Sequence, residues 1–180
     1  MNSSVKFLLG IILIISITSC NRKSNFTSET RKKFENWSLN LQKLQFYIDN
    51  DIVLSREISK DTAKIFYGTA IFQDGKYYQN IKLKANTKGV CTAIYPDRLH
   101  VSFEKSDSKY LVFAAPNSFS GDNAYQLINE DQNIKKGFIN YDDNQYKLFV
   151  DKNWPKLMIS KKMENKERYD GRTMKGRRVK

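Results

Sequence analysis

Histidine, cysteine, proline and glycine are scarce in this sequence, which has one His, two Cys, three Pro and eight Gly among 180 residues. The single histidine, His100, lies in the alternating segment from Leu99 to Glu104. Successive residues of a strand point to opposite faces, so we expect His100 on the polar face, opposite Leu99, Val101 and Phe103. A histidine-based catalytic triad is therefore not expected.

Glycine-rich and metal-binding loops are also missing from the sequence. No phosphate-binding glycine loop is present. The acidic turns Asp49-Asn50-Asp51 and Asp142-Asp143-Asn144 lack the glycine and the twelfth-position glutamate of a Ca²⁺-binding EF-hand loop. We therefore expect no enzymatic activity. A hydrolase that brings two carboxylates together in space, as glycosidases do, is the alternative.

The charge balance is strongly basic, with 31 Lys and Arg against 19 Asp and Glu and a net charge of +12. Aromatic residues are abundant, with ten Tyr and eleven Phe. Many aromatics with few Gly and Pro favour a β-rich folded domain over a disordered chain. A basic cytosolic protein would point to nucleic acid, but the first twenty residues indicate another compartment.

The N-terminal segment has the pattern of a secretory signal. Lys6 precedes an apolar run of eleven residues, Phe7 to Ile17, which is closed by Thr18-Ser19-Cys20. A membrane-spanning helix needs about 20 apolar residues, so this run is too short to span a bilayer and is typical of a signal peptide. An exported protein meets lipid headgroups, cell-wall polymers and envelope proteins, so we expect no nucleic-acid partner.

Residues Ile17-Thr18-Ser19-Cys20 resemble the lipobox of bacterial lipoproteins, in which an aliphatic residue and two small residues precede a lipidated cysteine. The resemblance implies a signal peptide at residues 1–19, a mature chain that begins at Cys20, and covalent lipid on that cysteine. An ordinary cleaved signal with a chance cysteine is the alternative. With Cys20 lipidated, Cys91 has no disulfide partner and is expected to be a small buried residue. Cys91 and His100 alone cannot complete a tetrahedral zinc site.

The residues after the cysteine bear on sorting. In lipoproteins of this kind, an aspartate after the cysteine signals retention in the inner membrane, but Asn21 stands here. Arg22 and Lys23 are opposite in charge to the acidic clusters that accompany surface display. The resemblance therefore implies an outer-membrane anchor with the domain facing the periplasm. We expect a lipidated tether at residues 20–27, a single β-rich domain at 28–160 and a basic tail, disordered alone, at 161–180.

One amphipathic helix is expected before the strands. Phe34, Trp37, Leu41 and Leu44 recur at helical spacing, with Thr27 or Ser28 as N-cap. This spacing predicts a helix over Glu29–Lys43 that packs on the domain.

After Lys43 the apolar period falls to two, which predicts strands. Hairpin turns are expected at Asp49-Asn50-Asp51, at Asp74-Gly75 and at Asp142-Asp143-Asn144. Ile65–Gln73 is expected as a strand that leads into the second of these turns, and Tyr110–Ala115 as a central strand. About ten strands with tight turns predict a mainly β fold, an antiparallel sandwich or barrel.

Two further segments are candidates for binding. The loop from Pro116 to Asn123 carries Phe119, which either plugs the fold or contacts a partner. The last twenty residues carry nine basic and three acidic side chains, and the basic ones nearest the end are Arg172, Lys175, Arg177, Arg178 and Lys180. This tail would bind an anionic membrane surface or partner; a solvated extension without a partner is the alternative.

Four segments, Leu44–Ile48, Asp51–Arg56, Thr87–Cys91 and Leu99–Glu104, resemble in their order the small β-rich lipoproteins of trans-envelope secretion machines, in particular that of a variant type VI secretion system. The resemblance implies a non-enzymatic anchor that holds another envelope protein against the outer membrane. A lipocalin-like carrier of an apolar ligand is the second interpretation. An inhibitor of a cell-wall hydrolase is the third, although a basic inhibitor would be repelled by basic hydrolases.

Overall fold

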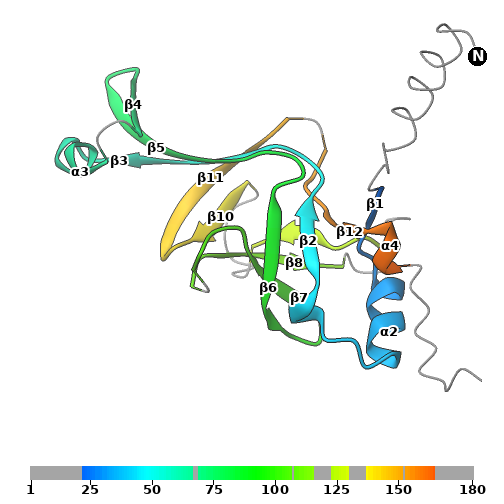
Figure 1. Ribbon diagram of the computed structural model, residues 1–180. Coiled ribbons are helices and arrows are strands. Elements are labelled where there is room, and N and C mark those ends of the chain that lie inside the picture. The colour runs from blue at the N-terminus through cyan, green and yellow to red at the C-terminus, as the bar shows by residue number, and fades with distance from the viewer. Residues whose placement is uncertain are drawn as a thin grey trace, which may run out of the picture.

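The computed structural model describes residues 22–66, 69–106, 108–115, 123–129, 137–151 and 153–164. Within these residues the fold is mainly β, as the sequence predicts, with two antiparallel sheets and a few short helices (Figure 1). The seven-stranded sheet has the order β1-β12-β2-β6-β7-β8-β9, and the five-stranded sheet has the order β10-β11-β3-β5-β4. The twelve strands are β1 (Lys23–Asn25), β2 (Gln45–Ile48), β3 (Ile52–Ile58), β4 (Ala70–Gln73), β5 (Lys76–Leu83), β6 (Lys88–Ile94), β7 (Arg98–Ser102), β8 (Tyr110–Ala114), β9 (Gln126–Ile128), β10 (Phe138–Tyr141), β11 (Asn144–Val150) and β12 (Leu157–Ser160).

The predicted helix begins where expected but ends early. Helix α2 (Ser28–Asn36) has Thr27 as its N-cap, whose side chain accepts from the backbone N–H of Thr30 at 3.1 Å. The prediction that the helix continues to Lys43 is wrong. Ser38 adopts a positive φ of 51°, and the N–H of Leu39 donates to the carbonyl of Phe34 at 2.9 Å, which closes a Schellman motif. A separate 3₁₀ turn, η1 (Leu41–Lys43), follows and buries Leu41.

Two of the three predicted hairpins are present. The β4–β5 hairpin turns at Asp74-Gly75, with φ values of 51° and 77°, and the β10–β11 hairpin turns at Asp142-Asp143, with 51° and 55°. Positive φ at both central residues is the signature of a type I′ turn, whose twist matches that of the strands. The strand expected over Ile65–Gln73 is only partly present, because α3 (Lys60–Ile65) ends at Ile65 and β4 begins at Ala70.

The third predicted hairpin, at Asp49-Asn50-Asp51, is wrong, because β2 and β3 lie in different sheets. Strand β2 pairs with β6 and β3 pairs with β5, so one antiparallel ribbon bends at a corner and runs from one sheet into the other (Figure 1). The carboxylates hold this corner. Asp51 accepts from the N–H of Ala85 at 2.7 Å, and Asp49 accepts from the N–H of Lys156 at 2.7 Å.

The seven-stranded sheet curls until its two ends meet. The N–H of Tyr125, just before β9, donates to the carbonyl of Phe26 at 2.8 Å, and the N–H of Leu157 in β12 donates to the carbonyl of Tyr125 at 2.8 Å. The space inside is filled by fully buried aromatic and aliphatic side chains. Phe26 is central there, with ring centroids 5.2 Å from Phe46 and 5.1 Å from Tyr125.

The folded domain is longer than the sequence predicts at both ends. Strand β1 pairs with β12 in the register Lys23 to Ser160, so residues 23–27 belong to the fold, and a tether over 20–27 is wrong for them. At the other end α4 (Lys161–Glu164) continues the domain beyond residue 160, with Met163 packed against the core. Of the expected basic tail, residues 165–180 lie outside the described residues.

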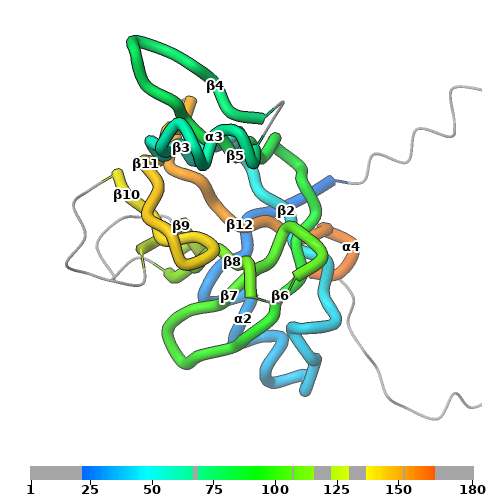
Figure 2. Tube along the Cα trace, turned by 90° about the vertical axis from the view of Figure 1, so that its left-hand side faces the viewer, coloured from blue at the N-terminus to red at the C-terminus, as the bar shows by residue number. Residues whose placement is uncertain are grey.

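The five-stranded sheet extends sideways from the seven-stranded sheet as an arm. Figure 1 shows α3 and β4 at the far end of this arm, and β1, α2 and α4 at the opposite end of the molecule. Figure 2, turned by 90°, places α3 and the β4–β5 hairpin towards the viewer and separates them from α4 and β1. We call α3, β4 and the adjoining ends of β3 and β5 the distal arm.

Candidate functional site

A groove runs across the five-stranded sheet on the face that points away from the core. Its volume is about 600 Å³, and all five strands line it. The pairing of the strands determines which side chains line the groove. Ser55 lies between Lys147 and Asn80 in one row of neighbouring strands. In the next row Tyr78 lies between Glu57 and Ile71. The groove therefore combines polar, charged and apolar side chains, as a site for a polypeptide does.

Among the described residues, four of the eight exposed large apolar side chains lie on this sheet or on the distal arm. Ile71 and Phe149 line the groove with 46% and 48% of their surface exposed. Phe72 is 62% exposed on the opposite face of β4, and Ile65, at the end of α3, is 81% exposed. Large apolar side chains that cluster on a surface mark interaction sites more often than isolated ones do.

The outer edge of the five-stranded sheet is formed by β4, which among the described residues pairs only with β5. In a two-residue hairpin the pair that flanks the turn, here Gln73 and Lys76, exchanges both hydrogen bonds. Antiparallel pairing alternates, so the N–H and C=O of Phe72 point away from β5, towards the edge. The sequence of β4, Ala-Ile-Phe-Gln, has none of the lysines or prolines that protect edge strands.

Two ion pairs lie on the distal arm. Lys76 Nζ lies 2.7 Å from Glu57 Oε2, and the pKa of Lys76 is raised by this hydrogen bond and charge. Lys64 Nζ lies 2.8 Å from Asp61 Oδ1. Residues 52–83, which comprise the distal arm and the rest of β3 and β5, carry five basic and three acidic side chains and therefore a net positive charge.

Arg56, which also lines the groove, connects β3 with β5 and β11. Its Nε donates to Gln79 Oε1 at 2.8 Å, its guanidinium lies 5.3 Å from the ring centroid of Tyr146, and it also donates to Asn144. The phenol of Tyr146 donates to the same Gln79 oxygen at 3.3 Å. Burial raises the pKa of Tyr146, so the phenol keeps its proton. These contacts fix the β10–β11 turn against β3 and β5.

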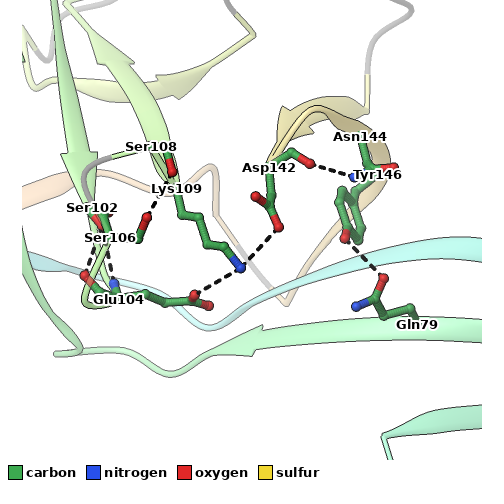
Figure 3. A network of polar contacts seen from close by, with 9 residues as sticks. All are labelled: Gln79, Ser102, Glu104, Ser106, Ser108, Lys109, Asp142, Asn144 and Tyr146. Atoms are coloured by element: carbon green, nitrogen blue, oxygen red, sulfur yellow. Dashed lines mark hydrogen bonds and ion pairs between the residues drawn. The ribbon is translucent and has the colours of Figure 1, made fainter. Parts of the chain in front are cut away.

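A second polar network joins the two sheets (Figure 3). Lys109 Nζ lies 3.0 Å from Asp142 Oδ2, in the β10–β11 turn, and 3.9 Å from Glu104 Oε2. Its pKa is raised by the hydrogen bond to Asp142. The pKa of the nearby Tyr141 phenol is raised strongly by burial and by Glu104. A general base needs a pKa near the working pH, and these shifts lead away from it, so we interpret the network as a link between the sheets.

The predicted position of His100 is wrong. It is buried rather than on a polar face, and its ring stacks on Tyr110 with centroids 4.0 Å apart and an interplanar angle of 12°. The ring of Tyr95 also lies against it, with centroids 4.7 Å apart. Strand β7 is thus buried on both faces, because aromatic side chains from its neighbours cover the outward one.

All seven sequence-predicted site residues lie outside the described residues. These are Cys20, Phe119, Arg172, Lys175, Arg177, Arg178 and Lys180. Cys91 is buried, as predicted, and burial raises the pKa of its thiol to about 11. Among the described residues, no group of three or more His, Cys, Asp or Glu side chains is arranged to hold a metal ion. No helix in the same part of the chain is long and apolar enough to cross a membrane.

Comparison with known proteins leaves the site to be interpreted from its own geometry. No protein-family model, no curated protein and no solved structure matches this chain. The groove and the edge of β4 were missed by sequence reasoning. The available signal was Ile71 and Phe72 beside the Asp74-Gly75 turn, in a strand too short to bury both faces.

Proposed function

We propose that this protein is a lipid-anchored, non-enzymatic binding component of an envelope assembly of the secretion type. In this proposal Cys20 carries the lipid, and the domain faces the periplasm from the outer membrane. The observation that carries it is the gathering of exposed Ile65, Ile71 and Phe72 on the distal arm, at the end of the molecule opposite β1 (Figure 1). A domain held through residues before β1 presents this arm to a partner.

The partner segment that fits the arm is an extended stretch of another envelope protein. Such a segment would pair with the N–H and C=O of Phe72 and continue the five-stranded sheet beyond β4. Its alternate side chains would face Ile71 on the groove side and Phe72 on the other. The net positive charge of residues 52–83 favours acidic side chains beside the apolar ones.

A second copy of this chain is a poorer fit for the same edge. Two copies would bring together surfaces of like sign, because the full chain has a net charge of +12 and only one of its basic residues, Lys6, lies in the expected signal peptide. An acidic extended segment meets the same backbone groups without that repulsion.

The carrier interpretation receives less support. We describe the seven-stranded sheet as a small barrel, and its interior is occupied by fully buried side chains such as Phe26, Phe46 and Phe113. A carrier of an apolar ligand needs a cavity of several hundred Å³ inside the barrel. The groove of about 600 Å³ lies instead on the outer face of the other sheet, where a polypeptide can reach it.

Lipidation is tested by metabolic labelling with radioactive palmitate. The wild-type chain should incorporate label, and Cys20→Ala should not, because the thiol that carries the lipid is gone. Cys91→Ala is the matched control and should be labelled normally. Continued labelling of Cys20→Ala, or no labelling of the wild type, would contradict the lipid anchor.

The binding surface is tested by photo-crosslinking in the native envelope. A benzoylphenylalanine residue is placed at Phe72, and in a control at Val90, which is 51% exposed on β6 of the other sheet. The Phe72 probe should give one defined adduct with another envelope protein, and Ile71→Asp should remove that adduct. An equal adduct at Val90, or none at Phe72, would contradict the proposed surface.

A further inference from the structure

The two ends of the described chain leave the fold side by side. Strand β1 pairs with β12 so that Lys23 lies opposite Ser160. One residue further out, the N–H of Lys161 donates to the carbonyl of Arg22 at 2.8 Å. Figure 1 shows β1 and α4 together at the end of the molecule opposite the distal arm.

Basic side chains surround this exit point. We call Arg22, Lys23, Lys33, Lys161 and Lys162 the terminal basic cluster; all but the half-buried Lys23 are exposed. Contacts hold two of them in place. Lys33 Nζ donates to the backbone carbonyl of Glu164 at 3.1 Å, and Lys23 Nζ lies 4.6 Å from the ring centroid of Tyr47.

The only acidic side chain that the described contacts bring into the cluster is Glu164, whose Oε2 accepts from Ser24 Oγ at 2.5 Å. Glu29 also lies one helical turn before Lys33 on α2, so five positive charges face two negative charges. The residues that follow in the sequence are also mainly basic, since residues 165–180 carry seven basic and two acidic side chains.

The position of Cys20 relative to this cluster follows from the chain itself. Cys20 precedes Arg22 by two residues, and an extended chain spans at most about 3.5 Å per residue, or about 7 Å. Charges interact over a screening length of about 8 Å at physiological ionic strength. A membrane that holds the lipid of Cys20 is therefore within electrostatic range of Arg22, and the backbone of Lys161 is hydrogen-bonded to that of Arg22.

We propose that the terminal basic cluster is a second membrane contact, which binds the headgroups of acidic phospholipids beside the lipid anchor. The position of this contact beside the lipid anchor rests on the proposed lipidation of Cys20. The attraction of the basic side chains to acidic headgroups does not depend on it. The occupant is a lipid surface rather than a single anion, because the cations come from β1, α2 and α4 and spread around the exit of both chain ends. One lipid chain alone gives reversible attachment, and a basic patch is the kind of second signal that stabilises it.

This contact also orients the molecule. A domain that meets the membrane through β1, α2 and α4 points its distal arm away from the bilayer (Figure 1). The cluster thus determines which part of the domain a partner can reach, which a lipid anchor alone would not do.

The test uses the chain from Asn21 to Lys180 without lipid, which contains every described residue. Binding is measured by co-sedimentation with vesicles of phosphatidylcholine alone or with 30% phosphatidylglycerol, at two salt concentrations. The cluster variant combines R22Q, K33Q, K161Q and K162Q. The matched control combines K60Q, K64Q, K82Q and K147Q, which removes the same charge from exposed positions on the five-stranded sheet and its arm. Urea denaturation confirms that both variants fold.

We expect the wild type to bind the acidic vesicles only, and less tightly at high salt. The cluster variant should lose about tenfold or more in affinity, since each cation near an acidic leaflet contributes a roughly fivefold gain. The control should stay within about threefold. If both variants lost the same affinity for the acidic vesicles, binding would depend on the net charge of the protein and not on the cluster, and the proposal would be overturned.

A chain that ends at Glu164 separates the cluster from the tail. It should retain cluster-dependent binding, and complete loss of binding in that chain would place the site in the tail instead. Palmitate labelling of Cys20 is a separate measurement, so failure of the lipid anchor and failure of the basic cluster are distinguishable.

Discussion

The guanidinium of Arg31 donates to the phenol oxygen of Tyr125 at 2.9 Å. Tyr125 is also the residue whose backbone joins the two ends of the seven-stranded sheet, through Phe26 and Leu157. Arg31 further donates to the carbonyl of Tyr95 at 2.7 Å and to Glu35 at 2.7 Å. One buried side chain of α2 therefore ties the helix to the closure of the sheet.

Replacing Arg31 with Met should lower the free energy of unfolding by about 2–4 kcal/mol, because the Tyr125 phenol and the Tyr95 carbonyl lose a buried donor. Burial alone would lower the pKa of Arg31, but Glu35 and Tyr125 outweigh it and raise that pKa, so the side chain stays charged. Urea denaturation measures the loss. Arg31→Lys should recover only part of it, because one ammonium cannot reach three partners. Wild-type stability in the Met variant would show that the contacts are not stabilising.

Gly89 is required by the packing inside the seven-stranded sheet. A Cβ atom at this position would lie 2.7 Å from Val101 Cγ1 and 2.7 Å from Phe103 Cε1. Gly89→Ala should therefore destabilise the fold by about 1–3 kcal/mol through overpacking. The neighbouring exposed residue supplies the control, since Val90→Ala should change stability by less than about 0.5 kcal/mol. In the double variant Gly89→Ala, Val101→Ala the loss in free energy of unfolding should be smaller than the sum of the two single losses, because Val101→Ala removes an atom that the new Cβ would meet. A loss equal to that sum would argue against the clash.

Local signals predicted much of this fold because they act through local geometry. Asp74-Gly75 specifies its own turn, and the alternation around Leu99 identifies a strand whatever lies beside it. The same reasoning failed at Asp49-Asn50-Asp51. These polar residues predicted a hairpin turn, but in the structure they form the corner between the two sheets. Whether β3 folds back on β2 or enters another sheet depends on long-range pairing with β5, which no local pattern reports.

The errors at the helix and at His100 have different physical causes. Phe34, Trp37, Leu41 and Leu44 keep helical spacing across a break, since a Schellman motif at Ser38 and a 3₁₀ turn preserve which side is buried. His100 alternates correctly, but Tyr95 and Tyr110 cover the face expected to be solvated. The candidate groove needs side chains from five strands, so it emerges only once the register is known.

Asp49 should make the domain less stable as the pH rises through the acidic range. Burial raises the pKa of its carboxyl, although the hydrogen bond from the Lys156 backbone opposes the shift. A folded-state pKa above the unfolded one contributes stability that is fully present below the unfolded value and is lost as pH rises through the folded value. Asp49→Asn removes this dependence and keeps the oxygen that accepts from Lys156.

Asp49→Asn should therefore gain stability relative to the wild type between about pH 3 and pH 7, in urea titrations at each pH. Asp49→Ala loses the acceptor as well, and should be about 1–2 kcal/mol less stable than Asp49→Asn at both pH values. Parallel pH profiles for the wild type and Asp49→Asn would show that this carboxyl titrates normally.

Cys91 should report unfolding of the seven-stranded sheet through its reactivity. Its thiol is buried on β6, donates to the carbonyl of Ala93 at 3.4 Å, and has its pKa raised by burial to about 11. The thiolate is the reactive form, so at pH 8 its population is roughly a hundredfold below that of an ordinary thiol, and the surrounding side chains also exclude reagent. In the chain from Asn21 to Lys180, Cys91 is the only cysteine.

Reaction with dithionitrobenzoate should be slow in buffer and fast in concentrated urea, with a midpoint equal to that of the fluorescence transition. The control carries Cys91→Ser and Val90→Cys, which moves the thiol to the exposed neighbouring position, and should react at once without urea. Fast reaction of the native wild type would mean that β6 opens locally, and the sheet would then lack the closed packing that Phe26, Tyr125 and Leu157 give it.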